Sequence, residues 1–306
     1  DVVDMGAEVT RLTLDVLERT IFSDGIGADR EDVRLAMQRY FEVASRIDPF
    51  DILGLPAAIP RPRRLTVWST LRFFEKTIDT LIATRRRRLA EEPERVPQDL
   101  LTLLLNATDP QTGARLSEPE VRANVLTFIA AGHETTANCL TWSLYLLSQS
   151  PEWRARLRTE AERELDKDDI TTLADRLVET RAVIDESNRL YPPISAISRV
   201  ARGEDDLGGH AVRRGTMVVV APYVLHRHRT LWSRPNRFDP SRFLPGARES
   251  IDRFAYLPFG AGPRVCIGSA FALQEACVTL ASLARSFDWA LAPGHTVRPI
   301  QKMTLR

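Results

Sequence analysis

The chain of 306 residues has few cysteines, no excess of either charge and no visible secretion signal. Its 42 basic and 41 acidic residues leave a formal net charge of +1, so no global field favours nucleic acid or an anionic membrane as a partner. Its three cysteines include no C-x-x-C pair, so they form no disulfide framework, which is consistent with a reducing compartment. We therefore expect a cytoplasmic protein that binds no nucleic acid.

Long apolar runs are also missing. The apolar stretch Val125–Ala137 is interrupted by His133 and Glu134, so no membrane segment is predicted in this chain. The sequence contains no internal repeat and no low-complexity tract, which excludes a solenoid or a disordered tail as its main feature.

Apolar residues recur at helical spacing through most of the first 190 residues, which predicts a mainly helical structure. Pro56, Pro60 and Pro62 mark a loop between two of these helices. The cluster Arg85–Arg88 falls in the last turn of a helix, where basic residues complement the helix dipole, and we expect it on a solvated face. The helices expected before Pro151 span about 9–21, 33–47, 65–89, 99–106 and 118–149.

A capping box marks the beginning of the last of these helices, with Ser117 as the N-cap and Glu120 three residues further on. After Pro192 glycine and proline become frequent. Residues 217–220 (MVVV) predict a buried strand, and residues 231–262 predict mostly irregular structure. The predicted fold class is mainly α with small β-sheets.

Residues 259–268 (FGAGPRVCIG) carry the strongest functional signal in the chain. Cys266 directly precedes an apolar run, Ile267–Phe287, that is compatible with a helix. A thiolate at a helix N-terminus faces free backbone N–H groups and the positive end of the helix dipole, which favour an anion. Gly260 and Gly262 allow the loop to turn tightly and bring its N–H groups towards the sulfur.

The other residues of this loop indicate a flat ligand with an anionic edge. Gly268 leaves out the side chain that would hold the helix away from such a ligand, Phe259 is placed to shield its face, and Arg264 is placed to meet its anionic edge. Haem, held through its iron by Cys266, fits all of these features. The run resembles the haem-binding loop of the cytochrome P-450 family, F-x-x-G-x-R-x-C-x-G, and matches it at every fixed position.

Residues 131–136 (AGHETT) put polar groups in the middle of an otherwise apolar helix, where they are costly unless paired or functional. Gly132 leaves a gap in the helix surface that suits a small ligand. Thr135 either bonds back to a carbonyl one turn earlier or turns its hydroxyl into that gap. The alternative is a kinked core helix whose polar groups are satisfied.

This segment resembles the acid–alcohol pair of the same family, (A/G)-G-x-(D/E)-T-(T/S), again at each fixed position. The resemblance implies that Ala131 and Gly132 border the haem. It also implies that Thr135 donates a hydrogen bond to oxygen bound there and that Glu134 relays protons from solvent.

We expect several other histidines and cysteines to have structural roles and not to bind a metal. His133 begins an H-E-x-x-H zinc pattern, but an alanine stands where the second histidine is required, so we reject a zinc site. His226 and His228 are expected to have packing or surface roles. Cys139 and Cys277 are expected to be buried structural cysteines.

Glu186 and Arg189 lie three residues apart on a predicted helix, a pair that is common on any helix. Residues 238–243 (FDPSRF) resemble the family's P-x-R-F meander motif, whose arginine joins the E-x-x-R pair in a buried triad. The resemblance implies that Glu186, Arg189 and Arg242 hold the cysteine loop under the haem and take no direct part in the chemistry.

Arg199 lies where many bacterial members of the family place an arginine that binds a haem propionate. The resemblance also assigns five apolar residues to a substrate pocket, although the same residues are typical of an ordinary core. They are Phe128, Ile129, Ile194, Ala196 and Ile197.

The resemblance extends over nearly the whole chain and implies one haem-binding monooxygenase domain, residues 1–306, with haem b as its cofactor. Members of the family have a long segment before the part that resembles this chain, so we expect the chain to be incomplete at its N-terminus and at its extreme C-terminus. Residues 131–136 and 10–15 (TRLTLD) are most similar to bacterial fatty-acid hydroxylases fused to a flavoprotein, which favours an apolar small-molecule substrate.

The implied reaction inserts one oxygen atom from O2 into a lipophilic substrate, with electrons from NAD(P)H. Because the chain carries no flavin or iron–sulfur motif, we expect an electron-donor protein, a ferredoxin or a flavoprotein reductase, or a further domain. A peroxygenase that uses hydrogen peroxide and a non-catalytic haem-binding protein are the alternatives. The intact Glu134–Thr135 pair argues against both, because neither requires a proton relay.

Overall fold

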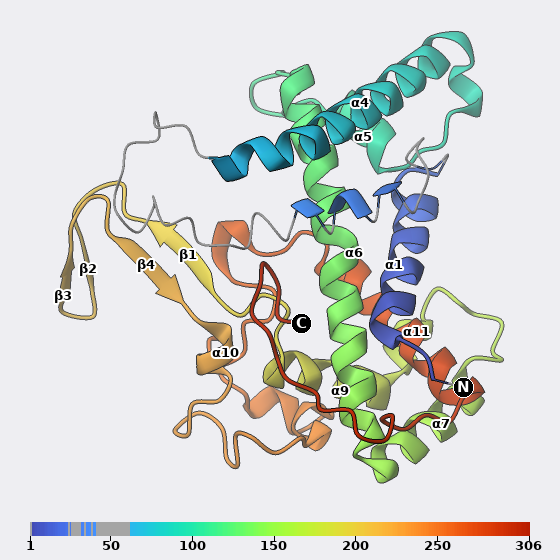
Figure 1. Cartoon of the computed structure of the whole chain (residues 1–306), viewed down its shortest axis with the longest axis vertical. Coiled ribbons are helices and arrows are strands. Elements are labelled where there is room, and N and C mark those ends of the chain that lie inside the picture. Colours follow the sequence, from blue (N-terminus) through green and yellow to red (C-terminus); the bar gives the residue numbers. More distant parts are fainter. Residues whose placement is uncertain (1, 24, 26–31, 34, 38, 41–61) are drawn as a thin grey trace. The chain divides into compact units, whose positions relative to one another are not determined.

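The computed structural model describes residues 2–23, 25, 32–33, 35–37, 39–40 and 62–306. These residues form a mainly α-helical structure with two small antiparallel sheets, as the sequence predicts (Figure 1). The chain divides into two compact units, Asp4–Ala137 and a second unit formed mainly by Asn138–Arg306. Most of the helix expected over 33–47, together with Pro56 and Pro60, lies outside the described residues.

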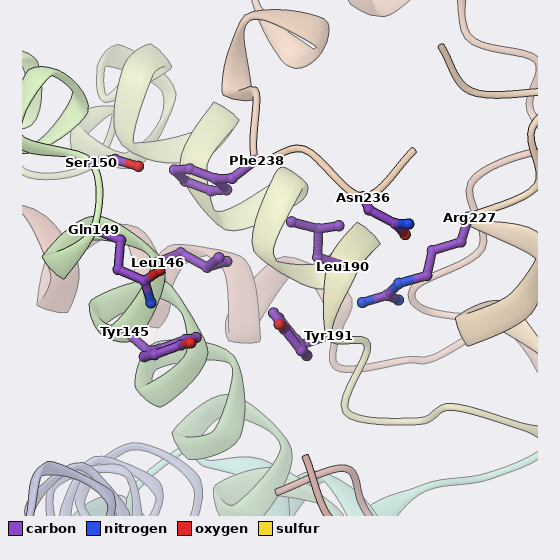
Figure 2. A pocket seen from close by; sticks show the side chains of 9 residues that line it. All are labelled: Tyr145, Leu146, Gln149, Ser150, Leu190, Tyr191, Arg227, Asn236 and Phe238. Atoms are coloured by element: carbon purple, nitrogen blue, oxygen red, sulfur yellow. The ribbon is translucent and has the colours of Figure 1, made fainter. Parts of the chain in front are cut away.

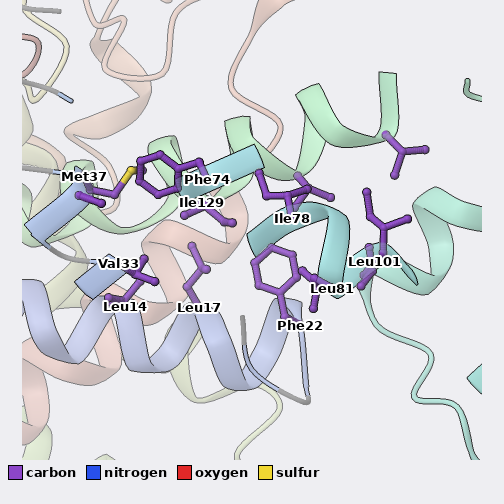
Figure 3. Packing of buried hydrophobic residues seen from close by; sticks show 14 residues of the cluster. Leu14, Leu17, Phe22, Val33, Met37, Phe74, Ile78, Leu81, Leu101 and Ile129 are labelled. Carbon is purple, nitrogen blue, oxygen red and sulfur yellow. The ribbon is translucent and has the colours of Figure 1, made fainter. Parts of the chain in front are cut away.

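The first unit consists of helices packed around one apolar cluster. Figure 3 shows side chains of α1, α4, α5 and α6 meeting in this cluster, among them Leu17, Phe74 and Ile129. Ile129, one of the residues predicted for the substrate pocket, is fully buried within this cluster, which agrees with the alternative of an ordinary core residue. The elements of this unit are α1 (Met5–Ile21), α4 (Pro62–Glu91), η1 (Pro93–Arg95), α5 (Leu100–Asn106) and the part of α6 (Glu118–Ser148) that extends to Ala137.

Two local expectations in this unit are corrected. Pro62 opens α4 instead of belonging to a loop, since proline lacks the N–H that a first helical residue leaves unpaired anyway. Arg85 is buried instead of solvated: it forms an ion pair with Asp99 and donates to Oγ1 of Thr102 at 2.7 Å and to the carbonyl of Phe22 at 3.0 Å. A buried guanidinium needs such partners, and the periodicity of α4 does not reveal them.

The start of α6 shows half of the expected capping box. The N–H of Ser117 donates to Oε2 of Glu120 at 2.8 Å, as a capping box requires. The hydroxyl of Ser117, however, donates to the same oxygen at 2.7 Å instead of accepting from a backbone N–H.

The second unit combines helices, two short sheets and an irregular segment. Helix α11 packs on α7 and α9, and every residue of α9 from Ala182 to Leu190 is buried. The elements are the rest of α6, α7 (Pro151–Glu164), α8 (Leu173–Arg176), α9 (Val178–Leu190), β1 (Ile197–Val200), β2 (Asp205–Leu207), β3 (His210–Val212), β4 (Met217–Val220), α10 (Pro222–Leu225), η2 (Pro240–Phe243), η3 (Arg248–Ser250), η4 (Gly262–Arg264) and α11 (Ser269–Ser286).

The sheets are smaller and more open than the sequence suggests. Strands β1 and β4 pair antiparallel, with Ile197 opposite Val220, and the β2–β3 hairpin projects from the end of this ladder (Figure 1). Strand β4 forms as predicted but is not buried: Met217 is 64% exposed and Val219 is 54% exposed. A two-stranded ladder buries its apolar side chains only where another layer covers it.

Between Leu231 and Gly262 the described chain has only short 3-10 turns, in agreement with the predicted irregular segment. No helix among the described residues is both long enough and apolar enough to cross a membrane.

Candidate functional site

The cysteine loop, residues 259–268, is a compact turn directly before α11. The N–H of Cys266 donates to the carbonyl of Phe259 at 2.9 Å and closes the loop. Gly260 and Gly262 have φ values of 74° and 75°, in the left-handed region that other residues rarely adopt. The loop therefore depends on glycine at these two positions, as predicted.

Cys266 is a free, exposed cysteine, in contrast to Cys139 and Cys277. Burial raises the pKa of both of those thiols to about 12, which agrees with a structural role. The N-cap of α11 is Gly268, and no side chain caps this helix end. A Cβ on Gly268 would lie 4.0 Å from Sγ of Cys266, so glycine keeps the space beside the sulfur open.

The surroundings of the sulfur fit haem, a flat apolar group with two carboxylates. Ile267 is 86% exposed and Val265 is 52% exposed, so apolar side chains lie open on both sides of Cys266 in the chain. Arg264 is exposed and has no hydrogen bond or ion pair with another residue in the part of the chain that the structure describes. An accessible thiol, apolar neighbours and an available guanidinium are the groups that a haem thiolate site requires.

Strand β1 approaches the same loop. A Cβ on Gly260 would lie 3.5 Å from Cδ1 of Ile197, so the two segments are in contact. Arg199 follows on the same strand, where it is exposed and donates to the carbonyl of Ser198 at 2.8 Å. Ile194 is half-buried and Ala196 is exposed. Among the residues predicted for the substrate pocket, the structure brings Ile197 to the cysteine loop.

A fully buried ion pair lies on α9. Nε and Nη2 of Arg189 donate to the two carboxylate oxygens of Glu186 at 2.6 and 2.8 Å. Arg189 also donates to the backbone carbonyls of His226, Pro235 and Arg237 at 2.7, 2.7 and 3.1 Å. Each donor of this guanidinium is thus used, and the ion pair holds the irregular segment onto α9.

Arg242 lies at the edge of this network. Its Nε is 3.7 Å from Oε1 of Glu186, an ion-pair distance but not a hydrogen bond. A shorter contact comes from the N–H of Asp239, which donates to the same oxygen at 2.8 Å. The three predicted residues therefore meet, with backbone groups supplying more of the contacts than Arg242 does.

Helix α9 carries a second buried carboxylate that the sequence reasoning missed. Asp185 pairs with Arg181 at 3.0 Å and with Arg248, and its Oδ1 accepts from the hydroxyl of Tyr256 at 3.0 Å. The Tyr256 hydroxyl also lies 2.8 Å from the carbonyl of Asp185. In the sequence, Asp185 is marked only by its position directly before Glu186.

In the first unit, residues 131–136 form a regular part of α6. Thr135 is half-buried and its hydroxyl donates to the carbonyl of Ala131 at 2.9 Å, the first of the two predicted arrangements. Glu134 and His133 are buried, and Nδ1 of His133 lies 2.8 Å from the carbonyl of Ile129. The helix continues through the segment without a break.

Gly132 does not leave the expected gap. A Cβ on this residue would lie 2.4 Å from Cδ1 of Leu17, a residue of α1 that is fully buried. The expectation of a space for a small ligand at Gly132 is therefore wrong in this structure, because α1 fills it. An alanine at this position would require the Leu17 side chain to move. Phe128, one turn earlier, is half-buried.

A hollow of about 450 Å³ lies elsewhere in the second unit, where α6 and α9 end (Figure 2). It contains none of the predicted site residues. The ring of Tyr191 stacks on Trp142 at 4.0 Å, and the guanidinium of Arg227 lies 5.3 Å from the Tyr191 ring. The hollow is lined by Tyr145, Leu146, Gln149, Ser150, Leu190, Tyr191, Arg227, Asn236 and Phe238.

The arrangement around Cys266 fits a haem-thiolate protein. In agreement, the family described as Cytochrome P450 matches residues 1–305, and the chain belongs to this family. The family membership confirms the resemblance stated from the sequence, although it does not decide the similarity to flavoprotein-fused hydroxylases.

Relatives and solved structures agree with this assignment. Cyclooctatin synthase of Streptomyces melanosporofaciens is 34% identical over 99% of this chain and 65% of its own length. Pentalenene oxygenase of Streptomyces avermitilis is 33% identical over 99% of this chain and 66% of its own length. The crystal structure of the cytochrome P450DA heme domain has a TM-score of 0.83 at 30% identity and covers 99% of this chain and 66% of its own. The chain thus spans about two thirds of the length of these proteins.

Proposed function

We propose that this chain is the haem-binding part of a monooxygenase that inserts one atom of O2 into an apolar small molecule. The observation that carries the proposal is the free, exposed Cys266 in a glycine-dependent loop ahead of an uncapped helix. Haem b, bound through this sulfur, supplies oxygen activation, because a thiolate ligand pushes electron density that favours O–O cleavage.

The residues near Cys266 hold the cofactor in this proposal. Gly260, Gly262 and Gly268 keep the backbone and the sulfur accessible, and Phe259 shields one face. Arg264 and Arg199 both have exposed guanidinium groups and pair with the two carboxylates of haem. The Glu186–Arg189 pair takes no part in the reaction and keeps the segment before the loop in place.

The polar groups of α6 handle protons in this proposal. The hydroxyl of Thr135 donates to the carbonyl of Ala131 and can rotate to donate to a ligand instead. Glu134, the residue before Thr135, is buried and passes protons towards this hydroxyl. Removing the Thr135 hydroxyl should therefore lower the amount of product formed per NADPH consumed, without preventing haem from binding.

Substrate and electron donor follow from the relatives and from what the chain contains. Pentalenene oxygenase is, by its name, an enzyme that oxidises an alkene, which supports an apolar substrate here. The similarity of residues 131–136 and 10–15 to bacterial fatty-acid hydroxylases also supports an apolar substrate. Electrons from NAD(P)H reach the haem through a ferredoxin, a flavoprotein reductase or a further domain, since no flavin or iron–sulfur motif is present in these 306 residues.

The test supplies the haem-loaded protein with NADPH, a ferredoxin and its reductase, and 18O-labelled O2, using a panel of fatty acids and terpenes. We expect one 18O atom in the product and no comparable turnover with hydrogen peroxide alone. Product formed only with peroxide would identify a peroxygenase, and no product with either oxidant would favour a non-catalytic haem protein.

A matched pair of variants tests the proton route. Thr135→Ala is expected to lower product formed per NADPH by about 100-fold, the low end of the range for a lost proton-transfer group. Thr127→Ala is the control, because Thr127 makes the same bond to a carbonyl one turn earlier, at 2.7 Å, on the same helix. Equal effects of the two substitutions would contradict the role of Thr135.

A further inference from the structure

His226 is a fully buried histidine that none of the roles described so far explains. It follows α10, and its ring lies 5.2 Å from the ring of Tyr256. Burial lowers the pKa of His226 to about 4. The backbone groups of Asn188 and Arg189 have the opposite, smaller effect, because they favour the charged ring. The imidazole is therefore neutral at physiological pH and carries one proton.

The ring acts as a hydrogen-bond acceptor. The backbone N–H of Leu257 donates to Nε2 of His226 at 2.8 Å. Since a neutral imidazole has one accepting and one donating nitrogen, the proton is on Nδ1. The bond to Leu257 thus selects one tautomer of the ring.

The backbone of the same residue belongs to the buried ion-pair network. The carbonyl of His226 accepts from Nη1 of Arg189 at 2.7 Å. One residue therefore connects the Glu186–Arg189 pair on α9, through its main chain, with Leu257, through its side chain. Both contacts lie within the second unit.

Leu257 lies two residues before the cysteine loop. Its carbonyl accepts from the N–H of Gly260 at 3.2 Å, and the carbonyl of Phe259 accepts from the N–H of Cys266 at 2.9 Å. A continuous set of hydrogen bonds therefore leads from Arg189 through His226 and Leu257 into the loop. Tyr256 adds a second anchor, because its hydroxyl bonds to Asp185 on α9.

We propose that His226 is a positioning residue, which holds the N–H of Leu257 through Nε2 and thereby fixes the start of the loop that presents Cys266. This inference rests on the proposed function in one respect, that the loop's ligand is haem. The proposed role requires a hydrogen-bond acceptor atom at the position of Nε2, whereas a residue that only fills space in the core would not need one. Volume and polarity alone do not satisfy this requirement.

Two amide variants separate these alternatives. In His226→Gln the side-chain oxygen reaches the position of Nε2 and can accept from Leu257, whereas in His226→Asn the shorter side chain cannot. Both replace the ring by an uncharged amide. His228→Asn is the control, because His228 is exposed and contacts Thr230 instead.

The first measurement is hydrogen–deuterium exchange by mass spectrometry on the haem-free protein. We expect the peptide that covers Tyr256–Gly260 to exchange about tenfold faster in His226→Asn, as expected for one lost hydrogen bond to a part-buried N–H. His226→Gln and His228→Asn should match the unchanged protein, and peptides from the α1 core serve as a check on overall folding. Equal exchange in the Asn and Gln variants would overturn the proposal.

The second measurement is the absorption spectrum of the reduced, carbon-monoxide-bound protein after haem loading. We expect His226→Asn to lose a large fraction of the thiolate-type band and His226→Gln to retain it. A full thiolate band in the Asn variant would show that loop position does not depend on His226. If the unchanged protein bound no haem, the proposed function would fail, while the exchange experiment would still decide the anchoring role.

Discussion

The cysteine loop and the polar segment of α6 carry the two groups of predicted site residues, and they are built in different ways. The loop is exposed and owes its shape to glycines and backbone hydrogen bonds close in sequence. Residues 131–136 lie in a regular helix, where the role of Gly132 depends on Leu17 in α1. The geometry of this loop could therefore be predicted from residue spacing alone. The role of a residue in the helix motif could not, because it also depends on the helix packed against it.

The largest expected effect concerns the network behind the cysteine loop. Arg189→Ala leaves the carboxylate of Glu186 buried without its partner, which should lower the free energy of unfolding by about 3–5 kcal/mol and abolish haem incorporation. Urea unfolding and haem content measure the two effects. Glu186→Ala should behave alike.

The control for this prediction is an ion pair of similar length near the surface. Arg156→Ala removes the Arg156–Glu179 pair, 2.7 Å long and partly exposed, and should cost less than about 1 kcal/mol. Normal haem content in Arg189→Ala or Glu186→Ala would show that the loop does not depend on the network.

The second-largest expected effect is on the pH dependence of stability, and it comes from Glu275 in α11, nine residues after Cys266. Burial raises the pKa of Glu275 to about 8, and neither carboxyl oxygen has a hydrogen-bond partner in the part of the chain that the structure describes. The folded protein therefore keeps a proton that the unfolded chain releases near the ordinary glutamate pKa of 4.5. Stability is lost as the pH rises between these two values.

Glu275→Gln should remove this loss. We expect the variant to be more stable than the unchanged protein by roughly 2–4 kcal/mol above about pH 8, and nearly equal to it below about pH 4.5. Denaturant unfolding at several pH values measures the difference, with the exposed Glu152→Gln as the control. A difference that does not change with pH would contradict the buried, protonated state of Glu275.

The smallest effect tests the helix side of the comparison. Gly132→Ala places a methyl group 2.4 Å from Cδ1 of Leu17 and should cost about 1–3 kcal/mol of stability, as overpacking does in other cores. Combined with Leu17→Ala, it should cost less than the sum of the two single changes. Gly203→Ala, where no atom lies within 4 Å of the added Cβ, is the control. Strictly additive costs would mean that Leu17 does not determine the glycine at this position.

The sequence predicted the helices well because each one leaves a periodic pattern and local end signals. Two such end signals are Asp99, which caps α5 and accepts from the N–H of Thr102, and Pro151, which begins α7. Burial was harder to predict. The apolar run of β4 gave no sign that the strand is exposed, and Arg85 gave none that it is buried, because both depend on segments distant in sequence.

The candidate site shows the same division. The spacing of residues 259–268 was sufficient to single out Cys266 and its two left-handed glycines. The carbonyl acceptors of Arg189, and the bond from Leu257 to His226, were not foreseen. Backbone groups are present in every residue, so no residue type marks the ones that a buried side chain will find.

The most direct test of the account is the absorption spectrum of the reduced, carbon-monoxide-bound protein, recorded for the unchanged chain and for Cys266→Ser. The account predicts a thiolate-type band in the first and its complete loss in the second, with Cys139→Ser and Cys277→Ser retaining it. A thiolate-type band that survives Cys266→Ser would contradict the assignment of this sulfur as the haem ligand.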